Sequence, residues 1–121
     1  QNIPCRARRN RTVPARGFAR ISTGVSFRIP AGWEGQLRGR SGHAAKCHPA
    51  HFGTIDSDYL GICQAIVYNA TDEAWVINPG DRIAQMVFKP VQAVCLKAIT
   101  KAEDNATSDR GTGGFGSSGL Q

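Results

Sequence analysis

Two short segments carry the polar groups expected of an anion site. In 39–46 (GRSGHAAK), a guanidinium group and a hydroxyl precede a glycine that opens a predicted helical turn. Backbone N–H groups at such a turn, beside a cation, can bind phosphate oxygens. In 79–88 (PGDRIAQMVF), Arg82 and Gln85 face opposite sides of a predicted strand, so one of them can point inward and need a partner. The alternatives are an ordinary turn and a surface glutamine.

The segment 53–61 (GTIDSDYLG) places two aspartates beside Tyr59 and between glycines. Asp56, the first of them, follows Ile55 and lies close to Phe52, so we expect its carboxylate to be partly desolvated. A carboxylate in that setting can act as a general base on a water molecule. The alternative is that both aspartates form a turn at a strand end, which is their commoner use.

The glycine-rich segment RGTGGFGSSG near the end of the chain also holds groups that suit a nucleotide. Arg110 offers a cation for phosphate oxygens, and Phe115 offers a flat face for a base. Ser117 and Ser118 add hydroxyls, while the glycines, Gly116 among them, allow the backbone to wrap a ligand closely. The segment predicts a flexible lid over a nucleotide.

Cysteine and histidine suggest no strong metal site. The segment HAAKCHPAH could supply soft ligands to zinc, but its four candidates crowd into nine residues and no second cluster is visible. The four cysteines of the chain form no CxxC pair, so we expect free thiols. The zinc candidates are His43, Cys47, His48 and His51.

The elements that must position these groups read as β-structure. Apolar and polar residues alternate with period two over 19–30, which is typical of a half-buried strand. Short apolar runs punctuated by turns favour an all-β barrel or sandwich. We expect further strands within 32–40, 61–70 and 74–91, a helical turn at 42–46 and a tight turn at 78–81.

The charge distribution divides the chain into a basic start and a neutral body. The net charge is +6, and residues 1–20 contain six arginines and no acid. Nucleic acid is therefore not an expected partner, apart from a contact of this arginine-rich start. No membrane-spanning run or signal peptide is visible, which predicts an intracellular protein of the cytoplasm or nucleus, a viral one included. We expect one β domain over 1–107, with about eleven residues as a basic leader, and a mobile arm over 108–121.

Four motifs in this order, GRSG, GTIDSDYLG, PGDRIAQ and RGTGGFGSSG, give the chain a resemblance to the trimeric dUTP pyrophosphatases (dUTPases). The resemblance covers residues 12–119 or so, and it implies a jelly-roll (β-clip) barrel that assembles as a homotrimer. It further implies hydrolysis of dUTP to dUMP and pyrophosphate, with Mg²⁺ carried by the triphosphate and each site shared among three subunits.

The resemblance also implies a role for each matching residue. Asp56 would activate the water that attacks the α-phosphorus, and Tyr59 would pack on the deoxyribose and exclude a 2′-hydroxyl. Phe115 would cover the uracil, and Gln85 would contact the phosphates or a metal-bound water. The remaining phosphate contacts would come from Arg40, Ser41, Gly42, Arg110, Gly116, Ser117 and Ser118.

The chain departs from the family at its start. The first family motif, of the form AGxDL, should lie near QNIPCRARRN, where no acid is present. In the family that aspartate helps to hold water around the magnesium. Either the chain starts late, the motif has decayed or this member binds metal differently, and a missing motif would weaken catalysis and leave a sheet edge unpaired. The alternatives are a catalytically weakened member that binds nucleotides or proteins, a related dCTP deaminase and, as the weakest, a nucleic-acid-binding barrel.

Overall fold

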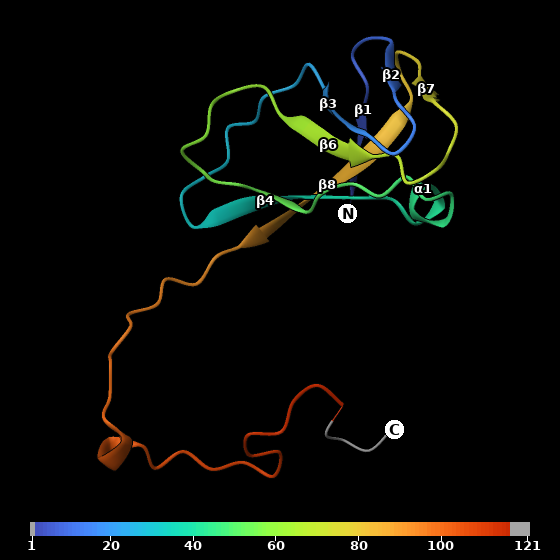
Figure 1. The fold of residues 1–121 in the computed structure, drawn as a ribbon. Helices are drawn as coiled ribbons and strands as arrows, with labels where there is room; N and C mark the ends of the chain where they lie inside the picture. Colours follow the sequence, from blue (N-terminus) through green and yellow to red (C-terminus); the bar gives the residue numbers. More distant parts are fainter. Residues whose placement is uncertain (1, 117–121) are drawn as a thin grey trace.

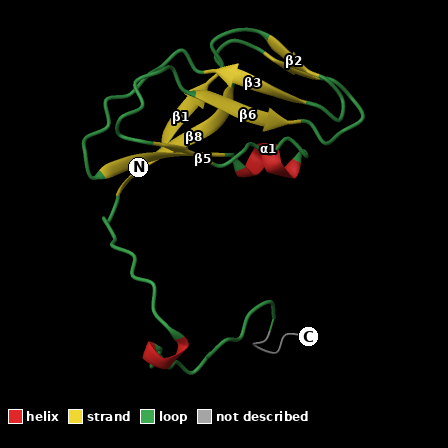
Figure 2. Cartoon of the chain, turned by 60° about the vertical axis from the view of Figure 1, so that its left-hand side comes forward, coloured by secondary structure: helices red, strands yellow, loops and turns green. Residues whose placement is uncertain are grey.

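A computed structural model describes residues 2–116, and this part of the chain is almost entirely β-structure (Figure 1). Two short helical segments interrupt it, α1 beside the sheets and η1 far out on the C-terminal segment (Figure 2). In chain order the elements are β1 (Ile3–Arg6), β2 (Arg11–Val13), β3 (Phe18–Ser22), β4 (Trp33–Arg38), α1 (Ser41–Ala45), β5 (Gly53–Ile55), β6 (Gln64–Tyr68), β7 (Trp75–Ile77), β8 (Arg82–Pro90) and η1 (Lys101–Glu103).

The strands pair into three antiparallel groups. The main sheet has the order β1-β8-β4-β5, and two ribbons, β2-β7 and β3-β6, complete the barrel. The long strand β8 is central because it pairs with β1 on one side and with β4 on the other. In Figure 1 the β3-β6 ribbon lies across from β8 and β4, so the apolar faces of the two layers meet.

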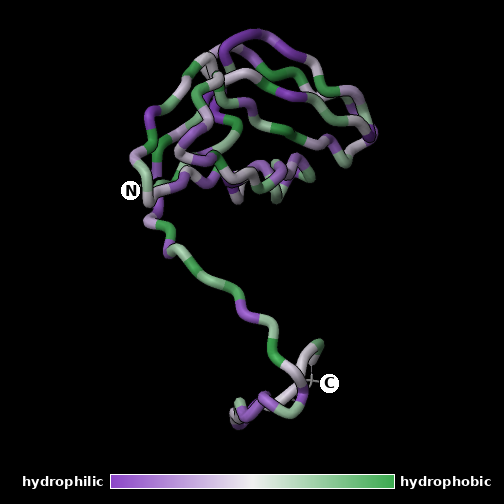
Figure 3. Tube along the Cα trace, turned by 90° about the vertical axis from the view of Figure 1, so that its left-hand side faces the viewer, coloured by the Kyte–Doolittle hydropathy of each residue, from purple (hydrophilic) through white to green (hydrophobic). Residues whose placement is uncertain are grey.

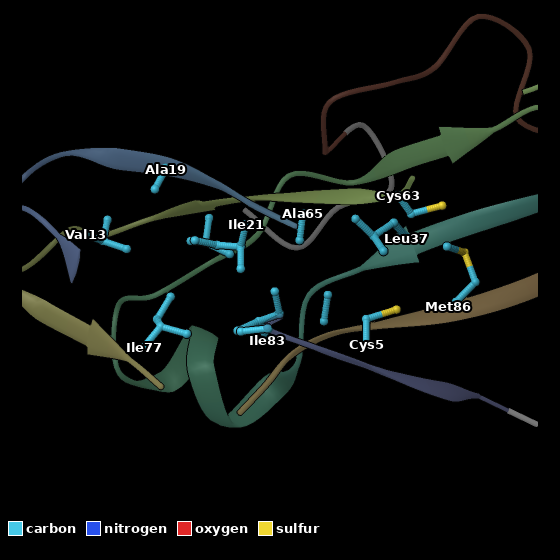
Figure 4. Packing of buried hydrophobic residues seen from close by; sticks show 13 residues of the cluster. Cys5, Val13, Ala19, Ile21, Leu37, Cys63, Ala65, Ile77, Ile83 and Met86 are labelled. Carbon is cyan, nitrogen blue, oxygen red and sulfur yellow. The ribbon is translucent and has the colours of Figure 1, made fainter. Parts of the chain in front are cut away.

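The core lies between these layers. Alternate residues of each strand point inward, as the period of two predicts. Ile21 and Ala65 from the β3-β6 ribbon face Ile83 and Cys5 of the main sheet in Figure 4, and all four are at most 5% exposed. The prediction of an all-β barrel is confirmed.

The strand predicted over 19–30 is shorter than expected. It ends at Ser22, because Gly24 adopts a left-handed conformation (φ +69°) that breaks the extended backbone. The Thr23 hydroxyl donates to the carbonyl oxygen of Cys63 at 2.8 Å and fixes the bend. The alternation beyond Ser22 therefore belongs to an irregular segment, in which Ile29 is still buried.

The start of the chain pairs with the main sheet. Ile3–Arg6 forms β1 and runs antiparallel to β8, so it covers that side of β8 and is itself an edge strand of the main sheet. Cys5 and Ala7 point into the core at 5% and 4% exposure, and the residues between and around them face outward. Small apolar side chains at alternate positions thus pack the basic start of the chain against the barrel.

The two predicted local turns are present. Between β7 and β8 the Asp81 N–H donates to the Asn78 carbonyl oxygen, the Asp81 carboxylate accepts from the Asn78 N–H, and Gly80 has φ +87°. The helical turn expected at 42–46 is α1, which begins one residue earlier.

After β8 the chain leaves the barrel. Figure 1 shows this segment running away from the sheets, and Figure 3 shows hydrophobic residues spaced along it. Val94, Leu96 and Ile99 are 74%, 95% and 53% exposed. Such apolar side chains on an extended segment lack the cover that folding of one chain normally gives them.

Candidate active site

The short helix α1, the residues at its two ends and Gln85 of β8 line a hollow of about 280 Å³, which we call the α1 hollow. Arg40 lies just before the helix in an extended conformation (φ −108°, ψ 140°), so the chain turns sharply into α1. The N–H groups of a first helical turn have no partner within the helix. An added Cβ at Gly42 would meet none of the described atoms within 4 Å, so the space there is open. The hollow is lined by Arg40, Ser41, Gly42, His43, Lys46 and Gln85.

The side-chain amide of Gln85 is held at both ends. Its Nε2 donates to the carbonyl oxygen of Gly39 at 3.0 Å, and its Oε1 accepts from Asn2 Nδ2 at 2.8 Å. A second N–H on Nε2 is left for a group in the hollow. On β1 the residue opposite Gln85 is Pro4, which offers neither a charge nor a backbone donor.

Two lining residues, His43 and Lys46, were missed as site residues by the sequence analysis. They lie three residues apart in α1 and its cap, a spacing that puts both on one side of a helix and that could have revealed them. The His43 Nε2 lies within hydrogen-bond distance of the Arg82 carbonyl oxygen, and its ring packs against Trp75. His48 stacks on the same indole, with 4.0 Å between the ring centroids. Partial burial lowers the pKa of His48, and the neighbouring His43 lowers it further.

A second hollow of about 380 Å³, the Tyr59 hollow, lies beside the connection from β5 to β6. The Tyr59 Oη donates to the carbonyl oxygen of Ile62 at 3.0 Å, and the Tyr59 N–H donates to that of Asp56. A Cβ at Gly61 would lie 2.5 Å from the Tyr59 Oη, so glycine is needed for the ring to lie where it does. The lining residues are Arg20, Thr54, Ile55, Asp56, Tyr59, Cys63, Gln64 and Ile66.

Asp56 is exposed, which corrects the expectation that its carboxylate is partly desolvated. The aromatic ring expected to shield it, that of Phe52, lies instead 5.7 Å from the guanidinium carbon of Arg38. Within the described chain the carboxylate is open to water. Desolvation of Asp56 would have to come from a bound ligand or from another copy of the chain.

The C-terminal segment that carries the predicted lid residues runs away from the sheets (Figures 1 and 2). Arg110 Nε donates to a backbone carbonyl oxygen three residues further on, at 2.6 Å. Phe115 is fully exposed, and Gly116 follows it with φ +86°. Ser117 and Ser118 lie outside the described residues.

The structure thus divides the predicted site into three parts. β4 ends beside the α1 hollow at Arg38, whereas Ile55, the residue before Asp56, pairs with Gly35 nearer the start of β4. The two hollows share no lining residue. The residues brought together are Arg40, Ser41, Gly42 and Gln85 in one hollow and Asp56 and Tyr59 in the other, with Arg110, Phe115 and Gly116 on the C-terminal segment.

The zinc candidates do not converge. Within residues 2–116 no group of three or more His, Cys, Asp or Glu side chains could hold a metal ion. All four cysteines lie in this range and are unpaired, which confirms the prediction of free thiols. Burial, with Cys63 adding to it, raises the pKa of the Cys5 thiol to about 11, and burial also raises the pKa of Cys63.

Comparisons with known proteins point to one family. The family model described as dUTPase matches residues 5–119. The deoxyuridine 5′-triphosphate nucleotidohydrolase of Paramecium bursaria Chlorella virus 1 is 43% identical over 109 residues, which are 89% of this chain and 75% of that protein. The enzyme of the same name from Rhizobium etli is 45% identical over 113 residues, 90% of this chain and 70% of that protein.

Comparison of the fold with solved structures indicates the same family. The dUTPase of Staphylococcus bacteriophage 80alpha, solved with dUPNHPP, superposes with a TM-score of 0.87 at 28% identity, over 97% of this chain and 85% of that one. No helix in the described part of the chain is long and apolar enough to cross a membrane. A family match that spans nearly the whole sequence, and relatives that share more than two residues in five with it, show that the chain belongs to the dUTPase family.

Proposed function

We propose that this chain hydrolyses dUTP to dUMP and pyrophosphate. The relatives described above carry the name of this activity. The observation that carries the proposal is the composition of the α1 hollow: two cations, a hydroxyl, an amide donor and the backbone at the start of α1, with no acid among its described lining residues. Such a site attracts a polyanion, and its described lining has no negative charge that would repel a triphosphate.

The α1 hollow would hold the phosphate chain. Arg40 supplies a planar cation that can bind two phosphate oxygens at once, and Lys46 adds a second charge. Ser41 and the backbone beside Gly42 would donate to the remaining oxygens, with the free N–H of Gln85. Phosphoryl chemistry depends mainly on this kind of positioning and charge neutralisation.

The Tyr59 hollow would supply the nucleoside contacts and the attacking water. The Asp56 carboxylate would accept a proton from a water molecule aligned with the α-phosphorus. The Tyr59 ring, fixed between Gly61 and Ile62, would pack on the deoxyribose and leave no room for a 2′-hydroxyl. This arrangement would favour dUTP over UTP.

The C-terminal segment would close the site. Arg110 would bind the γ-phosphate, and Phe115 would cover the uracil. Gly116, Ser117 and Ser118 would contribute to phosphate contacts. A lid that excludes water strengthens the electrostatic interactions beneath it.

These three parts do not meet within one chain, and the proposal therefore includes a homotrimer with shared sites. The α1 hollow of one copy would face the Tyr59 hollow of a second, and the C-terminal segment of a third would cover both. The exposed Val94, Leu96 and Ile99 support this assembly, because docking on another copy would bury them. Contact with another copy would also desolvate Asp56.

The α1 hollow does not fit a directly bound Mg²⁺. Oxygen-rich sites for this ion normally include a carboxylate, and the described lining of the hollow has none. Gln85 and Asn2 offer only neutral amides, and Pro4 stands opposite Gln85 on β1. We infer that Mg²⁺ would reach this site only on the triphosphate, and we assign no catalytic step to it.

Pyrophosphate release from dUTP, compared with release from dCTP, dTTP and UTP, tests the proposal. Turnover of dUTP well above the other three supports it. Ammonia release from dCTP without pyrophosphate would favour a deaminase, and nucleotide binding without either product would favour a non-catalytic member. The mass in solution, expected at about three times 13.0 kDa, tests the trimer.

A further inference from the structure

A third hollow, of about 660 Å³, lies where the turn between β1 and β2 crosses the end of β3. We call it the arginine groove. Its lining includes Asn10 and Gln64 but, among the described residues, no acid. The four guanidinium groups that give it its charge belong to Arg8, Arg9, Arg11 and Arg20.

The backbone fixes the position of Arg8 in this groove. The Arg8 N–H donates to the Ser22 carbonyl oxygen at 2.9 Å, and the Ser22 hydroxyl accepts from the Gly24 N–H at 3.2 Å. A Cβ at Gly24 would lie 2.8 Å from the Arg8 Cδ, so the side chain of Arg8 lies directly across the glycine. The shape of the groove therefore depends on a particular backbone conformation as well as on the basic residues in the sequence.

The charges of the groove are not neutralised by the described chain. None of its four guanidinium groups makes a hydrogen bond or an ion pair to a residue in 2–116. Two other arginines do find partners: Arg16 pairs with Asp72 at 2.9 Å, and Arg6 donates to the Gly80 carbonyl oxygen at 2.9 Å. Four like charges around one concavity repel each other, and a bound anion would relieve that repulsion.

We propose that the arginine groove binds a small oligophosphate, of the chemical class of inorganic pyrophosphate and triphosphate. Guanidinium groups bind phosphate oxygens in pairs. A diphosphate carries roughly three negative charges near neutral pH, since each terminal phosphate carries about 1.5 to 2. The groove can supply at least as many positive charges. No aromatic side chain is among its described lining residues, which disfavours single-stranded nucleic acid as the ligand.

The groove shares two lining residues, Arg20 and Gln64, with the Tyr59 hollow. Arg20 lines both, and on β3 it stands opposite Ile66, which also lines the Tyr59 hollow. An anion in the groove would draw the Arg20 guanidinium toward itself and away from the Tyr59 hollow. Binding itself requires no turnover, so the groove and the proposed function can be tested separately.

Calorimetric titration with inorganic triphosphate tests the groove. The chain used carries Arg40→Ala and Lys46→Ala, which remove the cations of the α1 hollow. We expect one triphosphate to bind per chain, and we expect Arg8→Ala with Arg9→Ala to weaken that binding about tenfold or more. The matched control is Arg28→Ala, because Arg28 is exposed, donates to the Phe27 carbonyl oxygen and does not line the groove.

Amide NMR on the unsubstituted chain gives an independent measurement. Titration with triphosphate should shift the signals of Ser22 and Gly24, because both amides lie against the groove. Affinity that is unchanged by the Arg8 and Arg9 substitutions, or shifts that miss these amides, would overturn the proposal. It would also be overturned by a ten-residue oligodeoxythymidylate that binds the same arginines more tightly than triphosphate does. Triphosphate binding in a chain that fails to hydrolyse dUTP would leave the groove standing and remove only the proposed function.

Discussion

Gly61 determines where the Tyr59 ring lies, because a side chain at that position would overlap the phenol. We predict that Gly61→Ala displaces Tyr59 and breaks its hydrogen bond to the Ile62 carbonyl oxygen. Selectivity for dUTP over UTP, measured as the ratio of kcat/KM values, should fall by about tenfold, the scale expected when a small steric exclusion is lost. The matched control is Gly42→Ala, since a Cβ there meets no described atom; it should leave this ratio unchanged.

Asp56 is the residue proposed to accept a proton from the attacking water. Asp56→Asn should lower pyrophosphate release from dUTP by about 10²- to 10⁴-fold, the usual contribution of a general base. Binding of the non-hydrolysable analogue dUPNHPP should persist, because the phosphate contacts lie in the α1 hollow. Asp58→Asn, two residues further along the same exposed turn, serves as the control and should keep its activity. Equal rates for the Asp56 variant and the unsubstituted chain would refute the assignment.

Most of the predicted site residues line one of the two hollows, but their surroundings were not predictable from the sequence. The types of residue in GRSG and PGDRIAQ predict the α1 hollow, since Arg40, Ser41 and Gln85 all line it. Exposure depends on packing between distant segments, which residue spacing does not determine. Asp56 is exposed, and Phe52, four residues earlier in the sequence, lies against Arg38.

At the scale of elements, β1 is held to β8 by backbone pairing and by the buried Cys5. Burial raises the pKa of that thiol from 9.0 to about 11, so the folded chain keeps it neutral where the unfolded chain ionises it. The free energy of unfolding should therefore fall as pH rises from 9 to 11, by at most about 2 to 3 kcal/mol from this group. Urea unfolding in the presence of a reductant would measure this.

Two variants separate the Cys5 contribution from other titrations. Cys5→Ala should show a shallower loss of stability between pH 9 and 11 than the unsubstituted chain. Cys95→Ala removes an exposed thiol and should leave the slope as it was. If all three slopes coincided, Cys5 would have no part in the alkaline loss of stability.

Removal of the C-terminal arm is expected to affect catalysis without affecting folding of the barrel. A chain that ends at residue 109 should keep its barrel, because within residues 2–116 no member of the core, nor any side chain packed against it, lies beyond Phe88. Turnover of dUTP should nevertheless collapse, since Arg110 and Phe115 are lost with the arm. Thermal unfolding by circular dichroism would report the first result and pyrophosphate release the second. Retention of full activity would show that the arm is not a lid.

Which elements could be predicted depends on where apolar side chains repeat. β4, β6 and β8 fall within predicted segments because large apolar or β-branched residues alternate in them. β1 was not predicted, since Cys5 is its one buried residue and the arginines that follow give no apolar alternation. The strand predicted over 19–30 is too long, because apolar periodicity does not reveal that Gly24 adopts a positive φ.

At the scale of the whole molecule, the shared-site proposal has a direct test in mixed assemblies. Chains with Asp56→Asn and chains that end at residue 109 should each be inactive alone. Refolded together in equal amounts, they should regain about a quarter of the unsubstituted activity, because random assembly gives a site an intact Asp56 and an intact arm with that frequency. No recovery in a mixture of confirmed trimers would mean that each site is built within one chain.

The spatial arrangement of the site residues could not be predicted from the sequence alone. The motifs fix the order of the site residues along the chain, but their distances follow from strand register. Ile55 pairs with Gly35, and this register sends Asp56 toward the start of β4 while Arg40 follows its end. Only the folded barrel shows that the two hollows are separate.

The separation of the two hollows and the arm within one chain has a genetic consequence. If each copy lends its three parts to three different sites, a copy defective in all three silences an entire assembly. A mixed population of good and bad copies in equal number would then retain only about one fully competent trimer in eight. Such an allele would be dominant over the intact one, whereas an allele defective in one part alone would disable a single site for each copy it contributes.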